Sequence, residues 1–165
     1  MNRPQVAYCL SGVMDHFPSG VPTEVDRMQH EVRRVILLIA GIAILTSAAL
    51  HGVVNVPHLH EDLMEFGVRP TLLGAVMLVL YFSVVAMFAF GGMVVGSAMG
   101  VFRDDRSGQA ALWIIAVGYA VFGFAGFMLV SGTPHMLGYA AMGFLVAIGA
   151  ALSRSRTEAD RRNVT

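Results

Sequence analysis

The sequence predicts an all-α integral membrane protein, built as an antiparallel bundle of four spanning helices. Three observations support this prediction. Apolar residues make up 56% of the chain and charged residues only 13%, four long runs carry no charge, and arginine is concentrated on one side of these runs. A soluble domain usually has about a quarter of its residues charged, so the lipid bilayer is the expected solvent. The formal net charge is zero, which gives no indication of nucleic-acid binding.

The chain begins with two segments that precede the first apolar run. Residues 1–22 hold no helical or alternating period, contain three prolines and lack the apolar core of a signal peptide, so we expect a flexible cytoplasmic tail. From Thr23 the pattern changes, because Thr23 and Asp26 resemble a helix-capping box and apolar residues recur at helical spacing. Residues 23–34 are therefore predicted to form a short amphipathic helix along the cytoplasmic membrane surface.

Each of the four uncharged runs is long enough to cross a hydrocarbon core of about 30 Å at about 1.5 Å per residue. The runs comprise residues 35–54, 71–102, 110–131 and 134–152. The second is longer than a crossing requires, so it must tilt or project from the membrane. The connections are short, which favours antiparallel neighbours in one bundle. Residues 153–165 follow as a basic cytoplasmic tail.

The arginines predict how the bundle is oriented. Ten of the eleven lie before the first run, between the second and third, or after the fourth, and only Arg69 lies on the other side. Cytoplasmic loops of membrane proteins carry an excess of positive charge. The chain is therefore predicted to be a multi-pass protein of a bacterial inner (plasma) membrane with both termini in the cytoplasm. Residues 51–70 and the turn at 131–134 then face outward.

Histidines and carboxylates gather at this outer boundary. His51 lies near the end of the first run, where it shares a helix face with Ser47 and Asn55. Pro57 then interrupts the pattern. After it, residues 58–66 have one polar and one apolar side, so we predict a short interfacial helix outside the membrane.

The fourth run adds a histidine at the same predicted level. His135 falls in the first helical turn, with Tyr139 one turn deeper on the same face. The polar residues of this boundary are His51, His58, His60, Glu61, Asp62, Glu65 and His135.

Two interpretations of this boundary remain open. In the first, it binds a divalent transition metal, for which imidazole and carboxylate groups are suitable ligands. The predicted metal ligands are His51, His58, His60, Glu61 and His135. A haem b bound through His51 or His135 is a variant, and Glu61 or Asp62 would serve as acid or base. In the second interpretation, the same residues form a solvated polar face that binds nothing.

Three functional hypotheses follow, and the sequence leaves open whether the protein is an enzyme. No charged residue lies within the four runs, so no proton relay or ion path is indicated. The first hypothesis is a non-catalytic accessory or assembly subunit of a membrane complex, or a homo-oligomeric bundle, since Gly92, Gly96 and Gly100 share one face. The alternative is a metal- or haem-dependent membrane enzyme or redox protein acting on an apolar substrate. The third is a pocket for a lipid or small molecule.

Overall fold

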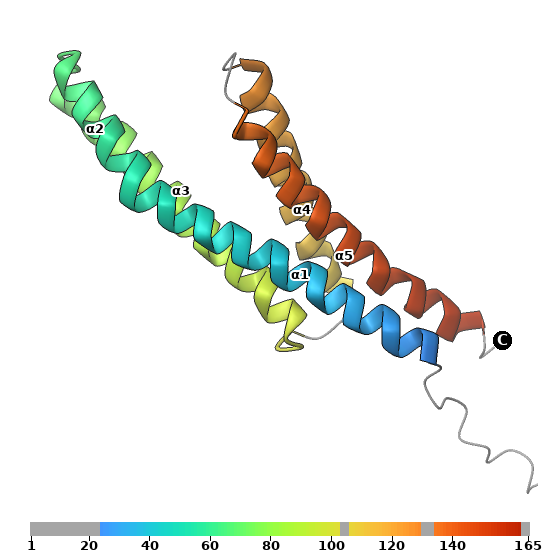
Figure 1. The fold of residues 1–165 in the computed structure, drawn as a ribbon. Coiled ribbons are helices and arrows are strands. Elements are labelled where there is room, and N and C mark those ends of the chain that lie inside the picture. Colours follow the sequence, from blue (N-terminus) through green and yellow to red (C-terminus); the bar gives the residue numbers. More distant parts are fainter. Residues whose placement is uncertain (1–23, 103–105, 130–133, 163–165) are drawn as a thin grey trace, which may run out of the picture.

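The computed structural model describes residues 24–102, 106–129 and 134–162, and these residues are helical apart from short connections (Figure 1). The all-α prediction is confirmed for this part of the chain. The elements are α1 (Glu24–Leu50), the π-helical turn η2 (His51–Asn55), α2 (Val56–Glu65), α3 (Pro70–Ala98), α4 (Arg106–Leu129) and α5 (Met136–Arg162). The predicted tail at residues 1–22 lies outside the described residues.

The first three elements follow one another without a gap, so a single helix extends from residue 24 to residue 65 (Figure 1). We expected Pro57 to separate the first span from an interfacial helix, because proline has no N–H group and its ring displaces the carbonyl four residues earlier. The π-helical turn accommodates this proline. The N–H group of Val56 donates to the carbonyl oxygen of His51, five residues back, and Pro57 follows within the first turn of α2.

Three helices in the described part of the chain are long and apolar enough to cross a membrane. They are the stretch Arg27–Glu65, α3 and α4. The apolar part of α5, Met136–Leu152, is shorter than the roughly 20 residues that a crossing usually requires, although α5 continues as a helix to Arg162. The length and composition of these helices are those of a membrane protein.

The helices form two antiparallel hairpins that meet along one line. The first hairpin consists of the 24–65 helix and α3, and the second consists of α4 and α5 (Figure 1). Packing between α1 and α5 joins them, whereas α3 and α4 barely touch. The buried core lies in the half of the bundle that contains the beginning of α1. Its residues are Leu37, Ala40, Ile44, Val94, Ala98, Leu112, Ile115, Ala116, Tyr119, Val146 and Ala150.

Glycines allow the helices within each hairpin to approach closely. A Cβ atom at Gly91 would lie 2.8 Å from Cγ of Leu45, so a methyl group there would collide with α1. Gly123 faces the backbone of Ala140 in the same way, between α4 and α5. In a membrane, where lipid is as apolar as the side chains, such close packing is a main source of helix association.

Gly92, Gly96 and Gly100, which the sequence predicts to share one face of the second span, have different environments in the structure. Helix α3 ends at Ala98, and Gly100, with φ 73°, follows it as a left-handed cap. Gly92 has open space where a Cβ would stand, and Gly96 faces Phe102 of its own connection. The close contact with α1 is made one position earlier, by Gly91, because that is the face α3 turns toward α1.

Candidate functional site

A cleft of about 530 Å³ lies between the two hairpins. Residues between 80 and 90 of α3 and between 114 and 122 of α4 form its walls, and most of these side chains are apolar. These stretches lie in the middle of both helices, far from the polar ends. The volume is within the range of about 300–1,000 Å³ that small-molecule pockets have.

The cleft exists because the hairpins are joined along only part of their length. The core holds the two hairpins together in the half that contains the beginning of α1, and their other ends lie apart in Figure 1. Large apolar side chains, including Phe82 and Phe122, line the space that results. Two further residues complete the lining: Tyr139 of α5 and His51 of the π-helical turn.

Tyr119 is the polar group of this cleft that has no partner. Its side chain is 7% exposed, and its hydroxyl group is buried without a hydrogen-bond partner among the described residues. Its ring lies against the ring of Tyr139, with 6.3 Å between the centroids. The Tyr139 hydroxyl differs, because the hydroxyl of Ser47 donates a hydrogen bond to it over 3.4 Å. A buried hydroxyl group without a partner costs about 1–3 kcal/mol.

His51 contributes a hydrogen-bond donor to the cleft. The side-chain amide nitrogen of Asn55 lies 3.2 Å from its Nδ1 atom. An amide nitrogen only donates, so Nδ1 is the acceptor and the neutral imidazole carries its proton on Nε2. In this tautomer Nε2 is an N–H donor. The face that the sequence predicted from Ser47, His51 and Asn55 therefore joins α5 and lines the cleft.

The hydroxyl group of Ser83, which also lies in the cleft wall, has a hydrogen-bond partner. Its hydroxyl donates to the carbonyl oxygen of Val79 in its own helix, over 2.8 Å. A serine that bonds back to the preceding turn leaves no donor for a ligand. Ser83 and Tyr119 therefore form a natural pair for comparison, because both line the cleft and only one hydroxyl is free.

The structure brings two of the predicted metal ligands together. Nδ1 of His58 lies 3.9 Å from a carboxylate oxygen of Glu61, and both side chains are exposed. His60 is partly buried, and His135 is exposed just before α5 begins. The ends of the hairpins that carry α2 and the start of α5 are separated in Figure 1.

No group of three or more His, Cys, Asp or Glu side chains within the described ranges is arranged to hold a metal ion. The proposed acid–base residues Glu61 and Asp62 are both exposed on α2. The metal and haem hypothesis for this boundary therefore rests on the sequence alone.

No protein-family model, curated protein or solved structure matches the chain. The role of the cleft is therefore inferred from the residues that line it. Sequence reasoning missed Tyr119 and Ser83, because a tyrosine or serine inside an apolar run is indistinguishable from packing material when helix order is unknown. The available signal was that Tyr119 is the only tyrosine of the third run, which holds no charge.

Replacing Tyr119 and Tyr139 by phenylalanine should change the stability of the protein in opposite directions. Tyr119→Phe removes a buried hydroxyl that has no partner, so the ligand-free protein in detergent should gain about 1 kcal/mol of unfolding free energy. Tyr139→Phe removes the acceptor of Ser47, and we expect a loss of about 0.5–1.5 kcal/mol. Denaturant titration followed by circular dichroism measures both, and changes of the same sign would contradict this assignment.

Proposed function

We propose that this protein binds, in the cleft between its hairpins, an apolar molecule that carries a hydrogen-bond acceptor such as a carbonyl group. The observation that carries the proposal is the buried, unpartnered hydroxyl of Tyr119, a residue that lines a mostly apolar cleft. The cleft lies midway along α3 and α4, so the molecule would enter from the hydrocarbon interior of the bilayer.

The chemistry of the lining selects the class of ligand. Tyr119 and His51 supply donors, while the acceptor capacity of His51 Nδ1 is taken by Asn55. A hydrocarbon would fill the space but leave the Tyr119 hydroxyl unpaired. A carbonyl oxygen would satisfy it, and the apolar body of the molecule would pack against aromatic rings such as those of Phe82 and Phe122.

A comparison of two ligands of the same shape tests this proposal. Benzophenone carries a carbonyl group, and diphenylmethane has a methylene group in its place. In equilibrium dialysis of protein in lipid nanodiscs, the wild type should bind benzophenone about tenfold more tightly, since a free buried donor gains an acceptor. Tyr119→Phe should remove this preference.

Ser83→Ala is the matched control, because it also removes a hydroxyl from the wall, but one that is already bonded to Val79. This variant should keep the preference for the carbonyl compound. Equal affinity of the wild type for the two compounds would overturn the proposal, as would a preference that survives in Tyr119→Phe.

The proposal includes a four-span topology in a bacterial inner membrane with both termini in the cytoplasm. The excess of arginine at one end of the runs supports it, and in the structure Arg27 and Arg106 lie in the first turns of α1 and α4, with Arg34 two turns further along α1. The fourth span would be the apolar part of α5, with its shorter length compensated by the basic residues that follow.

Labelling of single cysteines on intact cells tests this topology. In a Cys9→Ser background, Glu65→Cys lies at the end of α2 and should react with a membrane-impermeant maleimide supplied from outside. Gln29→Cys lies near the beginning of α1 and should react only after the cells are opened. Both positions are exposed, so the reverse pattern would mean that the orientation is inverted.

We further propose that the protein acts without chemistry of its own, as a subunit of a larger membrane assembly or of a homo-oligomer. The described residues that line the cleft include no carboxylate or thiol that would act on a bound molecule. Only 11% of the most apolar window of α3 is buried within the chain, compared with 28% for α4. Much of α3 is therefore uncovered and available to another subunit.

Blue-native electrophoresis of gently solubilised membranes tests the assembly. We expect a complex larger than one chain, because α3 has so little cover within the monomer. Introduction of a bulky, polar residue by Gly92→Gln, at a position open in the monomer, should weaken the complex without unfolding the chain. A solitary monomer for the wild type would contradict this part of the proposal.

A further inference from the structure

An apolar stripe runs along one exposed side of α1. Six side chains form it, each between 47% and 60% exposed. They are separated alternately by three and four residues, which is the spacing of a coiled-coil heptad. We call this stripe the α1 seam, and it comprises Val25, Met28, Val32, Val35, Ile39 and Ile42. We propose that the α1 seam binds the α1 seam of a second copy of the chain, in a parallel coiled coil.

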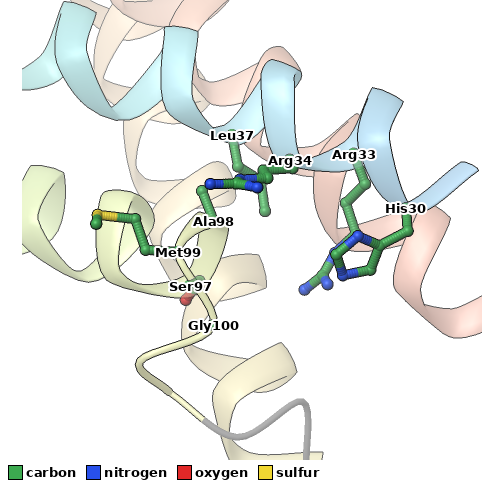
Figure 2. A pocket seen from close by; sticks show the side chains of 8 residues that line it. All are labelled: His30, Arg33, Arg34, Leu37, Ser97, Ala98, Met99 and Gly100. Carbon is green, nitrogen blue, oxygen red and sulfur yellow. The ribbon is translucent and has the colours of Figure 1, made fainter. Parts of the chain in front are cut away.

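The α1 seam lies on the side of the helix that faces away from the bundle. Leu37, which is fully buried in the core, is two residues from both Val35 and Ile39, or about 200° around the helix. Figure 2 shows His30 and Leu37 on the side of α1 that lies beside the end of α3. Helix α1 therefore has two apolar faces, and only one of them packs within the described part of the chain.

Lipid tails do not account for the first part of the α1 seam. Six of the eleven residues from 24 to 34 are charged, and charges at this density keep a helix out of hydrocarbon. Helix α1 continues without a break from Glu24 to Leu50, so its first turns extend the axis of the first span (Figure 1). Val25, Met28 and Val32 thus carry exposed apolar surface into water, and a second helix with the same spacing buries it.

The membrane determines how two copies of α1 meet. Copies inserted in one bilayer have the same orientation, so their α1 helices are parallel and corresponding residues lie at the same depth. Val25, Val32 and Ile39 occupy the heptad position where parallel two-stranded coiled coils favour β-branched Val and Ile. This inference rests on the membrane topology proposed above and deepens the proposed assembly, because it names a second copy as the partner.

The residues beside the α1 seam are compatible with such a pair. In a parallel coiled coil, the residue that precedes one seam position faces, on the partner helix, the residue that follows the next seam position. Glu24 then faces Gln29 of the second copy, which places a carboxylate opposite an amide donor. Arg27 and Arg34 are exposed and lie outside these flanking positions, so the two copies bring no like charges together.

Thr46 extends the same spacing into the first span, four residues after Ile42, and is exposed. Ser83 bonds to the carbonyl oxygen of Val79 in its own helix, whereas the Thr46 side chain makes no hydrogen bond among the described residues. Hydrocarbon supplies no partner for such a group. Because a hydroxyl both donates and accepts, two copies of Thr46 satisfy each other across the pair. This self-pairing favours a second copy over an unrelated protein.

Cysteine cross-linking in native membranes tests the inference. In a Cys9→Ser background, Val32→Cys treated with copper phenanthroline should give a covalent dimer of twice the chain mass. His30→Cys is the matched control, since this residue is exposed at the same level but lies on the side of α1 beside the end of α3. It should remain monomeric. Thr46→Val, added to Val32→Cys in liposomes with a large excess of lipid, should lower the dimer yield about threefold. Thr46→Ser should retain the yield.

Equal cross-linking of Val32→Cys and His30→Cys would overturn the inference, because it would indicate random collisions. An unchanged yield in Thr46→Val would contradict the pairing of the hydroxyl groups. If Val32→Cys stays monomeric while blue-native electrophoresis shows a large complex, the membrane surface or another protein covers the α1 seam. The inference would then fail while the proposed assembly stands. Circular dichroism of each variant verifies that the helices are intact, and none of these results depends on the cleft.

Discussion

The packing of α1 against α5 is the contact on which the rest of the structure depends. Leu37, Ala40 and Ile44 of α1 are fully buried in the core, and Gly149 of α5 lies so close to Leu37 that a methyl group would not fit. No comparable contact joins α3 to α4 in the described part of the chain. The two hairpins are therefore fixed in one half and diverge in the other, and the cleft follows from that single constraint.

The π-helical turn determines which polar group reaches this cleft. A proline within a helix usually kinks it, but the wider turn that precedes Pro57 keeps the 24–65 helix continuous. The inserted residue also shifts the faces of the helix on either side of it. His51, at the start of the turn, consequently lines the cleft, while His58 seven residues later is exposed beside Glu61. Histidines that are close in the sequence thus have different environments.

The sequence predicted the helical class and the approximate extent of the apolar segments, because those depend on composition and on hydrocarbon thickness alone. It did not predict the continuity through Pro57, since the local rule for proline says nothing about a compensating turn. The sequence places Gly92, Gly96 and Gly100 on one face, whereas the close approach to α1 is made by Gly91, one residue and about 100° around the helix from Gly92. Tyr119 was missed because its role depends on the order of the helices around the bundle.

The Tyr119 hydroxyl differs from the side chains of Ser83, Ser47 and Gln109, each of which has a hydrogen-bond partner. Ser83 bonds to Val79, Ser47 to Tyr139, and Gln109 reaches the carbonyl oxygen of Ala150. In hydrocarbon there is no water to replace a missing partner, so a polar group persists there only if something else satisfies it. A phenylalanine would pack equally well and would avoid the cost of the hydroxyl. Under the proposed function, a bound molecule would provide the acceptor that this hydroxyl lacks.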